Sequence, residues 1–371
     1  MIIANRENNM ENTFSKVLNI SSQNLSVLPS ECIDLIVTSP PYPMIEMWDS
    51  CFSSQSLDVK LALKEKEWNA AFENMHVVLD LVWKECDRIL KKNGYICINI
   101  GDATRTCDGN FQLFPNHARI INYFFHKGYN ILPDVHWHKQ SNAPNKFMGS
   151  GMLPAGAYVT YEHEYILIFR KGGKREFKSE DLSIRRESAY FWEERNTWFS
   201  DLWDIKGTSQ IIKNPKSRKR SAAYPFEIPY RLINMYSVYG DTVLDPFGGI
   251  GTTAIASAAS CRNSIICDID GDICNCAKSN IAASFINLNE IIDNRVYRHL
   301  LFIDNLSKER QEMCYENRVH HFLVKTRQEI DLTIYYLLSM SEMQEGFLFN
   351  YDILPQDYSS ISIIKSPFSV T

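Results

Sequence analysis

The chain has 371 residues, of which 45% are hydrophobic and 22% are charged, and its formal net charge is −5. This composition is ordinary for a globular protein with a large core, and no apolar run approaches the roughly 18 residues that a membrane span requires. Segment 1–12 lacks the apolar stretch of a signal peptide, so we expect a cytoplasmic protein with no membrane association. The ten cysteines include no C-x-x-C pair, so we expect reduced thiols and no metal site.

The first part of the chain alternates between apolar runs and helical periodicity, which is typical of an α/β fold. After a loose arm at 1–12, the sequence predicts these elements in order: a strand at 16–20, a strand at 33–37, a helix at 68–90 ended by Asn93-Gly94, a strand at 95–100, a helix at 116–126 and a strand at 130–137. The run from Ile33 to Val37 is apolar throughout, as expected for a strand buried on both faces of a parallel sheet. Ligands of open α/β sheets bind at the carboxyl ends of such strands.

A proline-rich turn, Ser39-Pro40-Pro41-Tyr42, follows this strand. Pro41 has a fixed φ and no N–H to compete for a ligand, so the turn can present a serine hydroxyl beside a backbone carbonyl. Segment 43–56 is predicted to be an irregular loop with several large apolar residues. It is either a lid over a ligand or a packed loop, and the residues favour neither alternative.

The middle of the chain is irregular and basic. Residues 139–220 contain 16 Lys and Arg against 10 Asp and Glu, inside a protein that is acidic as a whole. A strand is predicted at 163–169, and the residues after it mix arginines and lysines with tyrosines and tryptophans. Such a mixture suits a DNA surface, although a solvated basic loop is the plainer alternative. The candidate DNA-binding residues are Arg185, Arg186, Lys213, Lys216, Arg218, Lys219 and Arg220.

A glycine-rich turn, Asp245-Pro246-Phe247-Gly248-Gly249-Ile250-Gly251-Thr252-Thr253, dominates the next part of the chain. The elements predicted around it are a helix at 225–236, a strand at 242–244, a helix at 254–259, a strand at 264–267 and a helix to about residue 285. Glycines let a backbone approach a ligand closely and leave N–H groups pointing at it. Asp268 ends the second strand, where an acid can hold the hydroxyls of a ribose. A glycine turn alone can also be a tight connection, so this motif leaves both alternatives open.

The two turns together resemble motifs of the S-adenosylmethionine-dependent amino-methyltransferases of DNA, which carry S/D/N-P-P-Y and D-P-F-x-G-x-G-T-T. Their order here, with the S-P-P-Y turn first, is similar to that of the permuted beta class. The resemblance covers roughly residues 15–285. It implies a Rossmann-like α/β fold: a mixed, mostly parallel sheet with helices on both faces, an irregular target-recognition region and a C-terminal helical appendage.

The resemblance also implies a division of the chain. Residues 13–138 would form the catalytic half of the methyltransferase domain, 139–224 the target-recognition region and 225–285 the cofactor-binding half. The apolar clusters in 286–371 predict a helical appendage, whose role the sequence does not indicate.

Each motif residue acquires an expected role from the resemblance. The Ser39 hydroxyl and the Pro40 carbonyl would accept hydrogen bonds from the target amine, Pro41 would hold the turn and Tyr42 would stack on a base flipped out of double-stranded DNA. The residues expected to bind S-adenosylmethionine are Asp245, Pro246, Phe247, Gly248, Gly249, Gly251, Thr252, Thr253 and Asp268.

Serine in the first position of S-P-P-Y resembles the N4-cytosine group more than the N6-adenine group, where aspartate is usual. We therefore expect a site-specific DNA methyltransferase acting on the N4 amine of cytosine and paired with a restriction endonuclease; N6-adenine methylation is the alternative. Methylation at C5 of cytosine requires a Pro-Cys nucleophile, and none of the 14 prolines precedes a cysteine. A DNA-binding module with an inactive methylase site is a remote third alternative.

Overall fold

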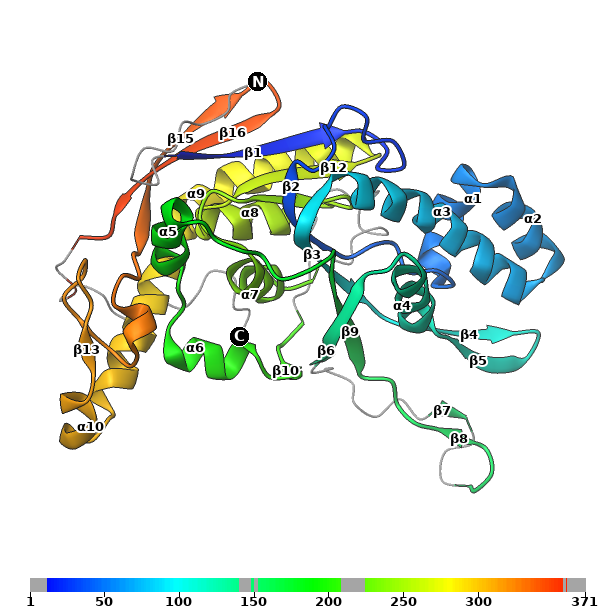
Figure 1. Cartoon of the computed structure of the whole chain (residues 1–371). Coiled ribbons are helices and arrows are strands. Elements are labelled where there is room, and N and C mark those ends of the chain that lie inside the picture. The colour runs from blue at the N-terminus through cyan, green and yellow to red at the C-terminus, as the bar shows by residue number, and fades with distance from the viewer. Residues whose placement is uncertain (1–11, 140–147, 150–152, 208–223, 356–357, 359–371) are drawn as a thin grey trace.

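The computed structural model describes residues 12–139, 148–149, 153–207, 224–355 and 358. Its centre is a ten-stranded sheet flanked by helices (Figure 1). In spatial order the strands are β10 (Leu202–Asp204), β6 (Asn130–His138), β9 (His163–Arg170), β3 (Leu90–Ile100), β2 (Ile33–Thr38), β11 (Thr242–Asp245), β12 (Asn263–Asp268), β1 (Asn12–Asn19), β16 (Gly346–Ile353) and β15 (Tyr335–Met343).

The five strands from β3 to β1 are parallel and form the middle of the sheet. Antiparallel pairs lie on both sides of them: β9 pairs with β3 and β6, and β16 pairs with β1 and β15. All six residues of β2 are buried, as the apolar run predicted. The predicted fold class, a mixed and mostly parallel sheet between helices, is confirmed.

Helices cover both faces of the sheet and each face has its own core. One core contains residues of α7 (Glu227–Tyr236), α8 (Thr252–Ala259) and α9 (Gly271–Asp304). The other contains residues of α1 (Asp49–Gln55), α2 (Leu57–Glu65), α3 (Trp68–Ile89) and α4 (Asn116–His126). In α3 the buried positions Met75, Leu79, Val82 and Cys86 recur at helical spacing, so one stripe of that helix faces the sheet.

Two expectations for the first half were wrong. Segment 43–56 is largely helical, since it holds the short helix η1 (Glu46–Trp48) and then α1. Asn93-Gly94 does not end α3, which stops at Ile89 and runs directly into β3. Asn93 instead takes a positive φ of 69° inside β3, and a Cβ on Gly94 would lie 2.8 Å from the Asp34 carbonyl oxygen. The pair therefore lets β3 pass close to β2.

The expectation of a helical appendage at 286–371 was also wrong. α9 continues to Asp304 and α10 (Lys308–Glu312) follows, but the hairpin β15–β16 then adds two strands to the central sheet beside β1. Its inward side chains, among them Leu337 and Phe349, alternate with less buried ones and belong to the core that contains α8 and α9. This period of two distinguishes strands from helices.

The remaining elements are short: β4 (Ala103–Cys107), β5 (Asn110–Phe114), β7 (Met148–Gly149), β8 (Ala157–Tyr158), η2 (Ser179–Asp181), α5 (Leu182–Glu187), α6 (Trp192–Trp198), β13 (Tyr315–Glu316), β14 (Leu323–Val324) and η3 (Arg327–Glu329). β9 and β10 belong to the central sheet although they lie inside the predicted recognition region, whose boundaries stay a prediction. All ten cysteines are free thiols. Within the described part of the chain, no helix is both long enough and apolar enough to span a bilayer.

Candidate active site

A cavity of about 320 Å³ lies where β2, β11 and β12 end, and both sequence motifs line it. β2 and β11 are parallel neighbours, so the turns that follow them emerge side by side. The two motifs are joined by a hydrogen bond from the Thr38 hydroxyl to Asp245 Oδ1, 2.6 Å long. Residues about two hundred positions apart in the sequence thus share one pocket.

The glycine turn is shaped by contacts that no other residue type would allow. A Cβ on Gly248 would lie 2.6 Å from Cβ of Ile266, and the Gly248 N–H donates to the Cys267 carbonyl at 2.8 Å. Gly249 and Gly251 have positive φ values of 51° and 92°. Gly251 does not line the cavity; it begins α8 and packs against Ala277 and Ile281 of α9.

Asp245 is buried beneath the cavity and held by donors of the protein itself. Its Oδ1 accepts the Thr38 hydroxyl and the Phe247 N–H at 3.0 Å, and its Oδ2 accepts the Thr253 hydroxyl at 2.6 Å. Burial raises the pKa of this carboxyl to about 6, against the hydrogen bonds, which lower it. Asp245 therefore joins the two motif turns through its hydrogen bonds.

The other cofactor candidates lie at the cavity wall. Asp268, at the end of β12, faces the cavity and accepts the Asp270 N–H at 2.9 Å, and burial raises the pKa of its carboxyl. Phe247 packs edge-on against Trp83, with ring centroids 5.9 Å apart, and forms an apolar wall with Ile45 and Trp48. An acid beside a flat apolar wall and a glycine turn is a donor set that fits ribose, adenine and the methionine end of S-adenosylmethionine.

The Ser39 turn borders the same cavity and is tied to a buried polar cluster. The Ser39 hydroxyl lies 3.2 Å from the Tyr42 hydroxyl, which donates to Glu164 Oε2 at 2.8 Å. Asn99 Nδ2 donates to the same Glu164 oxygen at 2.7 Å, and Lys139 Nζ contacts the other oxygen. Burial raises the pKa of Tyr42 well above its ordinary value, so its hydroxyl stays protonated. These groups form a continuous polar path that leads away from Ser39.

Comparison with known proteins agrees with this geometry. The family model described as DNA methylase, for N6 and N4 methyltransferases, matches residues 33–279. The chain belongs to this DNA methylase family. Membership confirms S-adenosylmethionine as the cofactor.

Two curated relatives are closely similar to the methylase over most of their length. The Type II methyltransferase M.MthZI of Methanothermobacter thermautotrophicus is 50% identical over 319 residues, covering 85% of this chain and 88% of that protein. The Type II methyltransferase M.MjaI of Methanocaldococcus jannaschii is 48% identical over 269 residues, covering 70% and 88%.

Solved structures agree on the fold. A putative DNA modification methylase of Thermus thermophilus, complexed with S-adenosylmethionine, has a TM-score of 0.56 and 28% identity, and the match covers 72% of this chain and 93% of that one. The cytosine-N4-specific PvuII DNA methyltransferase has a TM-score of 0.50 at 16% identity, covering 75% of this chain and 93% of that one, and supports the fold alone.

Several residues outside the predicted set lie at the cavity or beside it. The turn Ser21-Ser22-Gln23 lines the cavity, and Ser22 donates to the Pro246 carbonyl at 2.6 Å. Lys139, Glu164 and Tyr224 also line it. Asn99 was the one detectable signal, because an amide inside the apolar run 95–100 needs a partner where the strand ends. Asp102 pairs with His117 at 2.8 Å and does not line the cavity.

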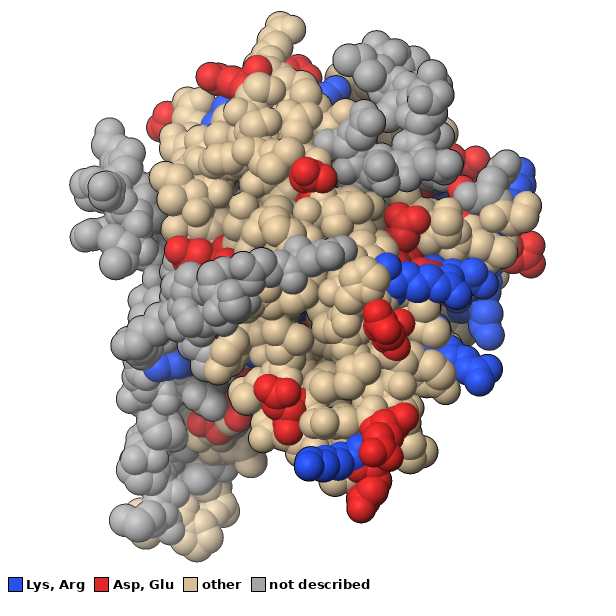
Figure 2. Space-filling model, turned by 90° about the vertical axis from the view of Figure 1, so that its left-hand side faces the viewer, with Lys and Arg blue, Asp and Glu red and all other residues tan. Residues whose placement is uncertain are grey.

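The predicted DNA-binding residues fall into two groups. Lys213, Lys216, Arg218, Lys219 and Arg220 lie outside the described residues. Arg185 and Arg186 are in α5 and line a different cavity, at the amino ends of the central strands. Figure 2 shows the left-hand side of Figure 1, where Lys and Arg gather toward the right-hand edge and Asp and Glu are scattered. The contact of the seven predicted DNA-binding residues with DNA stays a prediction.

Proposed function

We propose that this methylase transfers a methyl group to the exocyclic N4 amine of a cytosine flipped out of a specific double-stranded DNA site. The observation that carries this proposal is the shared cavity, which is lined by both Ser39 and the glycine turn and whose two motifs are joined by the Thr38–Asp245 hydrogen bond. Serine at position 39 supports cytosine as the base. N6-adenine is the second candidate, because the family includes both activities.

The chemistry requires that the amine become a nucleophile. Its lone pair is delocalised into the ring of the base, and hydrogen bonds from its two N–H groups to Ser39 Oγ and the Pro40 carbonyl would localise that pair on nitrogen. S-adenosylmethionine, when bound, supplies a methyl group on a positively charged sulfur. The turn residues contribute by fixing the amine in line with that methyl group and by excluding water.

The amine nitrogen must lose a proton when it gains the methyl group, and the polar path from Ser39 offers a route. Ser39 Oγ would accept that proton while its own passes to the Tyr42 oxygen and the tyrosine proton passes to Glu164. Lys139 contacts the other carboxylate oxygen of Glu164 and leaves the oxygen nearest Tyr42 to receive the proton. Tyr42 is thus held by its hydroxyl and lines the cavity, where a base could pack against it.

Nucleoside analysis of DNA from cells expressing the protein tests the base. We expect N4-methylcytosine, and we expect none of it from cells expressing Ser39→Ala, whose affinity for the cofactor should remain near that of the wild type. Detection of N6-methyladenine without N4-methylcytosine would mean that the target base is adenine and not cytosine. Binding of DNA with no methylation at any sequence would favour the inactive DNA-binding module.

A restriction endonuclease is the proposed functional partner. Both curated relatives are Type II methyltransferases, which supports a role in marking host DNA against cleavage at the same site. Sequencing of methylated positions across a genome would give the site, and an endonuclease blocked by that modification would identify the partner.

A further inference from the structure

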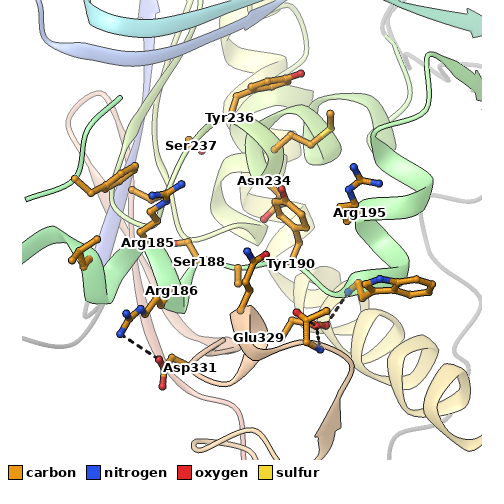
Figure 3. Close-up of a pocket in the computed structure, with 18 of the residues that line it drawn as sticks. Arg185, Arg186, Ser188, Tyr190, Arg195, Asn234, Tyr236, Ser237, Glu329 and Asp331 are labelled. Carbon is orange, nitrogen blue, oxygen red and sulfur yellow. Dashed lines mark hydrogen bonds and ion pairs between the residues drawn. The ribbon is translucent and has the colours of Figure 1, made fainter. Parts of the chain in front are cut away.

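A second and larger cavity, of about 1180 Å³, lies at the opposite end of the central strands and is called here the basic groove. It runs between α5, α6, α7 and the segment 326–331 (Figure 3). Tyr95 of β3 lines it, whereas Asn99 of the same strand donates to Ser39, which lines the methylase cavity. Four residues of strand, about 13 Å, separate the two levels, so the groove is not an extension of the methylase cavity.

The groove is rich in cations, most of which lack an acidic partner among the described residues. Eight Lys and Arg line it against two acidic residues. Asp331 pairs with Arg318 at 2.7 Å, and Glu329 is occupied by the Trp192 and Thr326 N–H groups at 2.8 and 2.7 Å. Five cations form no ion pair with any carboxylate in the described part of the chain: Arg170, Lys174, Arg185, Arg195 and Arg327. Clustering them costs free energy through repulsion, which an anionic ligand would relieve.

Aromatic rings alternate with these cations. The ring centroids of Tyr95 and Tyr236 lie 4.9 Å apart, and those of Tyr190 and Phe199 lie 5.5 Å apart. Trp192 and Phe199 remain 40% and 42% exposed. Arg185 is stacked 4.8 Å above Phe177, so its guanidinium is held in place while its N–H groups stay available.

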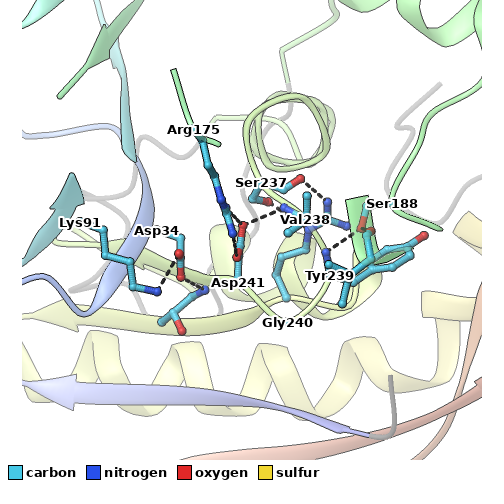
Figure 4. A network of polar contacts seen from close by, with 12 residues as sticks. Asp34, Lys91, Arg175, Ser188, Ser237, Val238, Tyr239, Gly240 and Asp241 are labelled. Carbon is cyan, nitrogen blue, oxygen red and sulfur yellow. Dashed lines mark hydrogen bonds and ion pairs between the residues drawn. The ribbon is translucent and has the colours of Figure 1, made fainter. Parts of the chain in front are cut away.

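The floor of the groove is rigid because a polar network fixes it (Figure 4). Asp241, which is 1% exposed, accepts both guanidinium ends of Arg175, at 2.5 and 3.0 Å, and the Val238 N–H at 2.8 Å. Ser188 accepts the Tyr239 N–H at 2.9 Å and so joins the turn after α5 to the same floor. The walls are therefore arranged before any ligand binds, which lowers the ordering cost of binding.

We propose that the basic groove binds a short segment of single-stranded nucleic acid, at a site separate from the methylase cavity. Unpaired cations would hold the phosphates, and the exposed rings would stack on bases. A duplex keeps its bases stacked inside, so it would leave those rings without partners. A mononucleotide has the same chemistry but would fill only part of a cavity this large.

Fluorescence anisotropy with labelled (dT)8 tests the proposal on the full chain, with inorganic polyphosphate and a blunt duplex of random sequence as competitors. The double variant Arg185→Ala/Arg195→Ala should weaken (dT)8 binding at least tenfold and flatten its salt dependence. Trp192→Leu should weaken (dT)8 about fivefold or more while leaving polyphosphate competition unchanged, because polyphosphate has no rings to stack. The duplex should compete more weakly than unlabelled (dT)8.

The matched control is Lys60→Ala/Lys64→Ala, which removes two exposed positive charges from α2 on another part of the surface. Equal (dT)8 affinities in this control and in the Arg185/Arg195 variant would overturn the proposal, as would stronger competition by ATP than by unlabelled (dT)8. Ser39→Ala should bind (dT)8 like the wild type. If the wild-type protein bound (dT)8 but methylated no DNA, the proposed function would be wrong and the groove proposal would still stand.

Discussion

Glu164 is the residue on which the proposed proton route ends. It is 7% exposed and its two carboxylate oxygens are shared among Tyr42, Asn99 and Lys139. Glu164→Gln keeps the shape but removes the proton acceptor, so we expect kcat to fall at least tenfold while cofactor affinity stays unchanged. Rapid-quench methylation assays of the variant and the wild type at saturating cofactor measure this difference in rate.

Glu162→Gln is the control for Glu164, because Glu162 precedes the same strand and lies outside the cavity. A normal rate in Glu164→Gln would remove the residue from the route, and an equal loss in Glu162→Gln would indicate a general effect of charge.

Asp245 gives the fold a dependence on pH. Its pKa is about 6 in the folded protein, above the ordinary value of 3.8, so the folded state holds a proton that the unfolded chain releases between these values. The contribution of this group is fully present below about pH 4 and is lost as the pH rises through 6. Compared with Asp245→Asn, the wild type should lose up to about 3 kcal/mol of unfolding free energy over this window. Urea titrations at pH 4.5, 5.5 and 7 measure the difference, and a constant difference would contradict the assigned pKa.

The motif residues of the cavity could be predicted from the sequence, but the polar residues that hold the Ser39 turn could not. Ser39 and Asp268 follow apolar runs, and the ends of such strands are recognisable in one dimension. Glu164 reaches the cavity because β9 pairs with β3, and Lys139 because β6 pairs with β9; no local pattern encodes these long-range pairings. Gly251 had the right signature for a ligand turn, yet its contact is with α9.

At the scale of elements, the turn between β11 and α8 carries the cofactor site, and Gly248 is its tightest point. Gly248→Ala would bring a Cβ to 2.6 Å from Ile266 Cβ on β12, so the turn must shift. We expect the affinity for S-adenosylhomocysteine, measured by calorimetry, to fall at least tenfold. Gly207→Ala is the matched control, because nothing lies within 4 Å of the added carbon; an equal effect there would contradict the steric explanation.

Helices and parallel strands with strong periodicity were predicted within a few residues. α4 has the predicted bounds, since its apolar face repeats clearly, whereas the boundary between α3 and β3 was misplaced. Asn-Gly is a common helix stop, but here the left-handed conformation of Asn93 serves a bulge in a strand. The Asn-Gly sequence predicts an unusual backbone conformation at this point. Only the pairing of β3 with β2 decides that this conformation forms a bulge and does not end a helix.

The whole molecule depends on the hairpin that completes the sheet. Phe349 is fully buried between the hairpin and the helices, so Phe349→Ala should lower the free energy of unfolding by about 3 to 5 kcal/mol. Leu338→Ala in the same hairpin, at a side chain that is 61% exposed, should change it by less than about 0.5 kcal/mol. Urea denaturation of both variants measures these values, and similar losses would mean that the hairpin is not part of the cooperative core.

Thr13 of β1 and Tyr351 of β16 are hydrogen-bonded across 338 positions of sequence. During translation, β1 is made before β16 and lacks this neighbouring strand until β16 has been synthesised. At a synthesis rate of about 5 to 20 residues per second, the wait is roughly 15 to 70 seconds. Until β16 has been made, the β1 edge of the sheet keeps unpaired N–H and C=O groups, which another strand could pair with.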